Sequence, residues 1–127
     1  MTLGYAPARA RKHLDDLITD APFLQWHIGD PGAAGTANPA ANTTRTDGTG
    51  KFAEATTAGA TTTKLSNAAI SVVGVPASED YTHVSFWTLA SGGSFLGSAL
   101  VTANALTSGD TLTIPSGGVS LTTANAS

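Results

Sequence analysis

The sequence contains no cysteine in its 127 residues. This absence excludes disulfide bonds, thiolate nucleophiles and thiolate metal ligands. Long apolar runs are missing as well: no segment approaches the ~18 residues that span a membrane, and the N-terminus has no apolar signal core. We therefore expect no membrane partner, and a protein that is made in the cytoplasm and not secreted by the standard route.

Charge is scarce too. Asp, Glu, Lys and Arg make up 12% of the chain, against roughly 25% in ordinary globular domains. A freely diffusing protein usually carries more charge for solubility, so this composition favours a component of an assembly. The net charge of −3 offers no general attraction to nucleic acid, and we expect no nucleic-acid partner.

Large apolar side chains are few, because much of the 41% hydrophobic content is alanine. We expect one domain over residues 1–127 with a thin core, as between two packed sheets. After residue 22, short strand patterns alternate with turn residues, which predicts an all-β fold: an antiparallel, jelly-roll-like β-sandwich. The expected strands cover residues 23–28, 51–57, 65–73, 82–89, 95–102, 110–114 and 118–122.

Residues 6–19 carry the one convincing helical pattern, with Pro7 in the first turn. The apolar residues form one stripe: Ala10, Leu14, Leu17 and Ile18. The basic residues precede the acidic ones: Arg9, Arg11 and Lys12, then Asp15 and Asp16. This charge order opposes the helix dipole, so the helix needs a docking surface on the sandwich or on a neighbouring subunit.

The first strand should place Leu24, Trp26 and Ile28 on one face and Phe23, Gln25 and His27 on the other. We expect Trp26 and Phe86 in the core. The turn Gly29–Gly32 follows, and residues 33–50 then have almost no large apolar side chains. We expect the loop from Gly29 to Gly50 to be mobile in an isolated chain and ordered against a neighbour, so that this loop and the helix are the main assembly elements.

Three residue groups are candidates for a chemical site. His27, Asp30 and His83 are suitable metal-ligand types, but their spacing crosses a strand end and a turn. We instead expect His27 to pack beside Trp87 or to bond a loop carbonyl, and Asp30 to cap its turn.

Gly48–Lys51 lacks the spacing of a phosphate loop, and no nucleophile elbow is present. We therefore expect no enzyme activity and no cofactor. Trp26, Tyr81 and Trp87 could form a sugar-binding platform, but aromatic residues in so small a core are more often buried.

The most informative motifs come in a fixed order: the helix, a strand ending in His27-Ile-Gly-Asp-Pro-Gly32, then Gly109-Asp-Thr-Leu112, and finally Gly117-Gly-Val119. This order resembles a family of small bacteriophage virion proteins, usually described as tail-fibre or minor tail proteins. The chain departs from that pattern at Trp26-His27-Ile28, where many relatives read Leu-His-Thr, and at Asn38-Pro39, where an Asn-Glu pair is usual.

The resemblance implies a virion structural protein that contacts other copies of itself and other virion proteins. Capsid decoration and recognition of a host surface glycan are the alternatives. The basic face of the helix would meet an acidic neighbour. We predict these interface residues: Arg9, Arg11, Lys12, Asp30, Asn38, Asn42 and Arg45.

Overall fold

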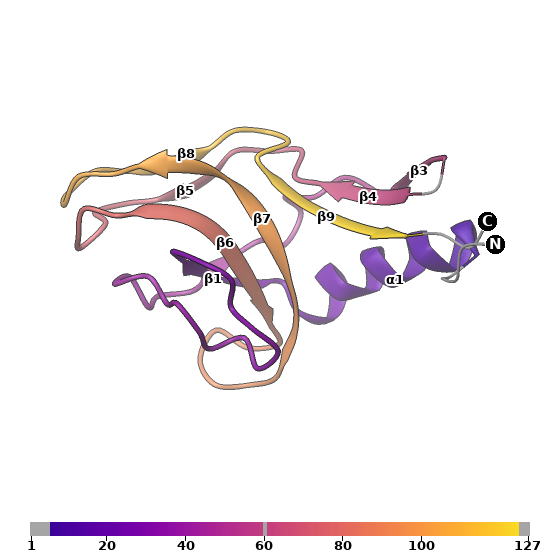
Figure 1. Cartoon of the computed structure of the whole chain (residues 1–127), viewed down its shortest axis with the longest axis horizontal. Helices are drawn as coiled ribbons and strands as arrows, with labels where there is room; N and C mark the ends of the chain where they lie inside the picture. Colours follow the sequence, from indigo (N-terminus) through magenta and orange to yellow (C-terminus); the bar gives the residue numbers. More distant parts are fainter. Residues whose placement is uncertain (1–5, 60, 125–127) are drawn as a thin grey trace.

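The structure is a computed structural model that describes residues 6–59 and 61–124 (Figure 1). In this part of the chain one helix, α1 (Pro7–Asp20), precedes nine strands. The strands are β1 (Phe23–His27), β2 (Thr46–Asp47), β3 (Thr56–Ala58), β4 (Thr61–Leu65), β5 (Ile70–Val72), β6 (Asp80–Trp87), β7 (Phe95–Ala105), β8 (Leu112–Ile114) and β9 (Val119–Ala124).

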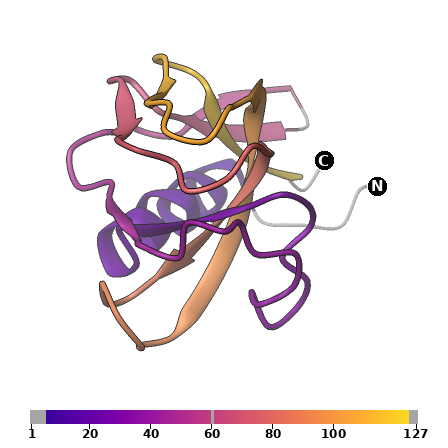
Figure 2. The ribbon, with the colours of Figure 1, turned by 90° about the vertical axis from the view of Figure 1, so that its left-hand side faces the viewer.

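Seven strands form one antiparallel sheet in the order β2-β1-β6-β7-β9-β4-β3, and β5 pairs with β8 in a second, small sheet. Figure 2 shows α1 and the small sheet on one side of β6 and β7, with the loop after β1 on the other side. The expected class, an all-β antiparallel sandwich with one N-terminal helix, is confirmed. The second layer of this sandwich consists of α1 and the small sheet.

The inner face of the large sheet carries the core. Leu24 and Trp26 on β1 lie opposite Phe86 and Val84 on β6, and all four are fully buried. The cluster continues through β7 and β9 to Ile114 and its neighbours in the small sheet. The prediction that Trp26 and Phe86 are core residues is confirmed.

Helix α1 docks on the same face, beside β4, β3 and β9. Its stripe is buried through Ala10, Leu14 and Ile18, and it has no side-chain cap and no acidic residue in its first turn. A side chain at Gly97 would stand 3.0 Å from Leu17, so glycine on β7 allows the helix to approach closely. The helix that stabilises itself poorly is therefore held by the domain's own sheet.

Local predictions for β1 and for the strands between residues 51 and 73 were wrong. β1 ends at His27, and Ile28 is exposed, whereas His27 is fully buried. The loop after β1 covers the outer face of the sheet at this point, so the alternation of buried and exposed residues ends. The expected strands 51–57 and 65–73 are displaced as well: the structure has β3 at Thr56–Ala58, β4 at Thr61–Leu65 and β5 at Ile70–Val72. On β4 the buried residues are Thr62 and Lys64, which give no apolar pattern.

Candidate assembly surface

The loop after β1 follows the free edge of that strand. The Asn38 carbonyl accepts a hydrogen bond from the Ile28 amide at 3.0 Å, and the Ala40 amide donates to the Trp26 carbonyl at 3.0 Å. Thr46 and Asp47 then pair with the start of β1 as β2. The expectation that this loop needs a neighbour to become ordered is therefore corrected, because backbone hydrogen bonds to β1 hold it within the domain.

The turn at the start of this loop is stabilised by side chains. The Asp30 carboxylate accepts the Gly32 amide at 2.8 Å, as predicted for a capped turn, and Gly32 has a φ of 75°. The Asn38 side chain donates to the Asp30 carbonyl at 2.9 Å. A side chain at Gly35 would collide with the ring of Phe95, so this glycine lets the loop lie close to β7.

His27 connects the loop to the sheet through a chain of hydrogen bonds. Its Nδ1 lies 2.8 Å from the Ala37 carbonyl oxygen, and its Nε2 lies 2.7 Å from Ser85 Oγ. The Trp87 indole N–H donates to the same Ser85 oxygen at 2.8 Å. A carbonyl only accepts, so Nδ1 carries the proton and the Ser85 hydroxyl donates to Nε2.

In this chain of hydrogen bonds, each polar atom has a partner only while the imidazole of His27 is neutral. A proton on Nε2 would make Ser85 Oγ accept from both His27 and Trp87, and the serine hydrogen would lose its acceptor. Burial lowers the pKa of His27, because hydrogen bonds with the loop backbone only partly offset the desolvation of the charged form. The expected bond from His27 to a loop carbonyl is confirmed.

Arg45 joins three segments at the far end of the loop. Its guanidinium lies 4.2 Å from the centre of the Trp87 ring and donates to the carbonyl oxygens of Leu89 at 2.8 Å and Gly92 at 2.6 Å. Its Nε also donates to the Gln25 side chain at 3.1 Å. Arg45 thus fixes the β6–β7 connection against the loop.

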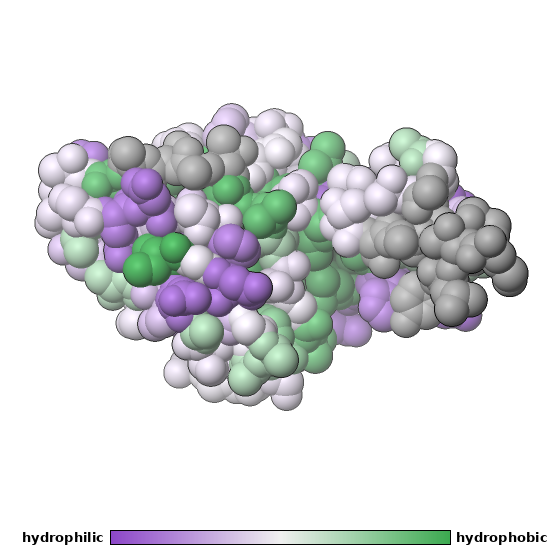
Figure 3. All heavy atoms as spheres, viewed as in Figure 1, coloured by the Kyte–Doolittle hydropathy of each residue, from purple (hydrophilic) through white to green (hydrophobic). Residues whose placement is uncertain are grey.

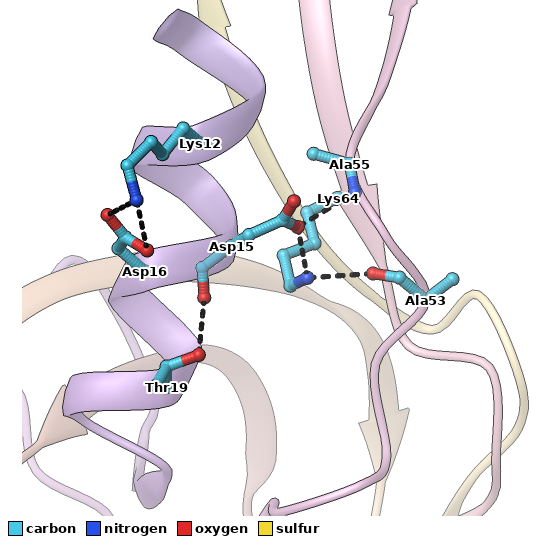
Figure 4. A network of polar contacts seen from close by, with 7 residues as sticks. All are labelled: Lys12, Asp15, Asp16, Thr19, Ala53, Ala55 and Lys64. Carbon is cyan, nitrogen blue, oxygen red and sulfur yellow. Dashed lines mark hydrogen bonds and ion pairs between the residues drawn. The ribbon is translucent and has the colours of Figure 1, made fainter. Parts of the chain in front are cut away.

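The helix is fixed to the sheet by an ion pair between α1 and β4 (Figure 4). Lys64 Nζ lies 2.6 Å from Asp15 Oδ1 and donates to the Ala53 carbonyl at 2.8 Å. Asp15 also accepts the Ala55 amide at 2.9 Å. Burial alone would raise the pKa of Asp15, but the hydrogen bonds from Lys64 and Ala55, with the nearby positive charges, outweigh it and lower the pKa.

The seven predicted interface residues fall into two groups that the fold keeps apart. Arg9, Arg11 and Lys12 lie on α1 beside β3 and β4, whereas Asp30, Asn38, Asn42 and Arg45 lie beside β1. The strands β6, β7 and β9 separate these two regions of the sheet.

Several of the seven make internal bonds. Arg11 donates to Thr57 on β3 at 2.7 Å, and the Asn42 side chain accepts the Thr44 amide at 3.0 Å. Lys12 forms an exposed ion pair with Asp16 at 3.1 Å, one turn along the helix. Arg9 is exposed and lines a hollow beside Leu96.

The residues that could bind a metal ion or a sugar make contacts inside the protein instead. Both ring nitrogens of His27 have partners within the protein. Within residues 6–59 and 61–124, no three His, Cys, Asp or Glu side chains are grouped to hold a metal ion. Trp26 and Tyr81 stack at 5.9 Å, and both are fully buried, so they form no exposed aromatic platform with Trp87. No helix in the described part is long and apolar enough to cross a membrane.

The outer face of the sheet carries a row of side chains that the sequence did not reveal. Strand pairing places His27, His83, Leu100, Ser120 and Leu65 side by side across β1, β6, β7, β9 and β4. The loop covers the β1 end of this row. Over β7, β9 and β4 the face is open, and Leu100 and Leu65 are 60% and 42% exposed.

The comparison with known proteins gives one match. The family described as "Podophage GP4 fiber I protein gp80" matches residues 19–122, which include every strand from β1 to β8 and most of β9. No curated protein and no solved structure matches the chain. The strand, turn and C-terminal motifs that suggested a phage virion protein all lie within the matched range. The chain therefore belongs to the gp80 family of podophage fibre proteins and is a structural component of the phage virion.

Proposed function

We propose that the protein is a fibre subunit attached to the phage tail, and that it acts by assembling with other copies of itself and with other virion proteins. Membership of a podophage fibre family, over residues 19–122, carries this proposal. The role is structural and not catalytic, which the same membership supports.

The low charge of the chain supports an assembled state. Charged residues make up 12% of the sequence, and the open part of the outer face presents leucine and hydroxyl side chains to solvent. Such a surface is poorly suited to a protein that stays alone in solution.

The predicted interface residues enter this proposal in two ways. Arg9 and Lys12 on α1, with Asp30 and Asn42 beside β1, are exposed or partly exposed and would contact neighbouring virion proteins. The remaining three, Arg11, Asn38 and Arg45, would shape those contact surfaces through their internal hydrogen bonds.

Gold-labelled antibodies against this chain, applied to purified virions and viewed by electron microscopy, test the location. We expect label on fibres at the tail. Label spread over the capsid shell would replace the tail assignment with capsid decoration. The proposal would be overturned if intact virions carried no label and an immunoblot of denatured virions with the same antibody showed no band for this chain.

A further inference from the structure

We infer that the open outer face of β7, β9 and β4 is the surface through which copies of this chain contact one another. This inference rests on the proposed function, because it names the surface that would perform the self-assembly. It is carried by the shape, the chemistry and the position of that face.

On this face two exposed leucines flank a small serine. Leu100 on β7 and Leu65 on β4 both lie opposite Ser120 on β9. Neighbouring strands are about 4.8 Å apart, so the two leucines stand about 10 Å apart with the small serine between them. A leucine from a second copy could lie over the serine between them, and each copy supplies both the leucines and the gap.

A hollow of about 310 Å³ adjoins this gap. Its floor and walls come from β7 and β9, and Asp30 and His83 stand among its lining residues. The side chains that share the face with the leucines are small and uncharged: Thr63, Ser98, Ser120 and Thr122. Apart from Asp30 and His83, these residues of the open face offer apolar carbon and hydroxyl groups.

This chemistry favours a second copy over a charged partner. Each chain has a net charge of −3, so two copies associate best where few like charges face each other. Among the described residues of the open face, Asp30 is the one acidic side chain that lines the hollow, whereas α1 carries several charges on its solvent side. A face on which leucines alternate with small hydroxyl side chains can pack against the same face of a second copy.

The position of the face also indicates a contact surface. The inner face of the same sheet is covered by α1 and the small sheet, and the loop covers the outer face over β1 and β6. Figure 3, viewed from the side on which that loop lies, shows apolar residues gathered in a band along β7. The remaining open part of the outer face therefore exposes apolar surface that a second copy would bury.

Charge-introducing variants of the full chain test this inference. Leu100→Asp and Leu65→Asp place a carboxylate on the open face, and Leu89→Asp is the matched control. Leu89 is 55% exposed but lies after the end of β6, outside this face. All three leucines are exposed, so the variants should retain the circular dichroism spectrum of the wild type.

Sedimentation equilibrium over a range of protein concentrations gives the association state. We expect the wild type and Leu89→Asp to self-associate alike. Leu100→Asp and Leu65→Asp should weaken association by about tenfold or more, since like charges that face each other across an interface are strongly unfavourable. Unchanged association of both variants would overturn the assignment of the face and leave the proposed function standing. A monomeric wild type at all concentrations would overturn both the assignment and self-assembly in solution.

Cysteine cross-linking provides a second measurement. The chain has no cysteine, so Leu100→Cys and Leu89→Cys each introduce one thiol. In intact virions, a short bis-maleimide should join Leu100→Cys chains to one another and leave Leu89→Cys chains single. Cross-linking of Leu100→Cys to a different virion protein, without pairs of this chain, would show that another protein occupies the face and would overturn the inference.

Discussion

Replacing Asp15 with alanine should destabilise the protein more than replacing Lys64 with methionine, although each change removes the same ion pair. The Lys64 side chain is 6% exposed and the Asp15 side chain is 38% exposed. In Asp15→Ala the ammonium group of Lys64 stays buried, and it keeps its hydrogen bond to the Ala53 carbonyl but loses its bond to Asp15. In Lys64→Met the carboxylate can turn to water or keep the Ala55 amide, and methionine fills the volume of the lysine stem.

The size of the effect follows from this asymmetry. Removing one partner of a fully buried pair costs about 3–5 kcal/mol. The partial exposure of Asp15 and the remaining bond to Ala53 reduce this, so we expect Asp15→Ala to cost about 2–4 kcal/mol and Lys64→Met about 1 kcal/mol or less. The double variant should be within about 1 kcal/mol of Lys64→Met, because no buried charge is then left without a partner.

Urea denaturation followed by tryptophan fluorescence measures these values, since Trp26 is buried and its emission reports on unfolding. Asp15→Asn is the matched control, because its amide oxygen can still accept hydrogen bonds from Lys64 and Ala55. Equal costs for the two single variants, or strictly additive costs in the double variant, would refute the reasoning.

Three further changes test the core and the loop. Trp26→Ala should cost roughly 3–5 kcal/mol as a truncation of a fully buried side chain, and an unchanged urea midpoint would contradict its position in the core. Tyr81→Phe should change stability by about 1 kcal/mol or less, because in the described part of the chain the buried hydroxyl makes no hydrogen bond of standard geometry and interacts only weakly with the Asn42 side chain; a larger loss would reveal a strong bond at that atom. The pKa of His27 is lowered from 6.5, so the unfolded chain binds more protons and stability should fall as pH drops below that value. Urea midpoints at about pH 7.5 and about pH 5.5 measure this, and His27→Gln should show a smaller difference between them; an equal pH dependence in His27→Gln would assign the effect to other groups.

The parts of the fold that local patterns encode could be predicted from the sequence. The apolar stripe of α1 at i, i+4 and i+8 is such a pattern, and it is buried as expected. Trp26 and Phe86 lie in strands whose apolar and polar residues alternate. The segment Gly29–Gly32 has the residues that a turn requires. The order of these motifs indicates a phage virion family, and the family match over residues 19–122 agrees with it.

The rest depends on contacts that leave no local pattern. The loop after β1 joins the sheet through backbone hydrogen bonds, which do not require apolar side chains, so its composition suggested a mobile segment. Lys64 points inward on β4 because Asp15, 49 residues earlier, neutralises it. The open outer face joins Leu65, Leu100 and Ser120, and only the register of β4, β7 and β9 reveals that they are neighbours.

The most direct test of the central claim is the number of copies of this chain in purified virions, measured by quantitative mass spectrometry. Phages that carry the wild type, Leu100→Asp or Leu89→Asp would be compared. If the protein is a fibre subunit that assembles through its outer face, the wild type and Leu89→Asp are incorporated in the same multiple-copy number. Leu100→Asp, although folded, falls to about a tenth of that number or less. Virions with a single wild-type copy, or with equal numbers of all three chains, would contradict the account.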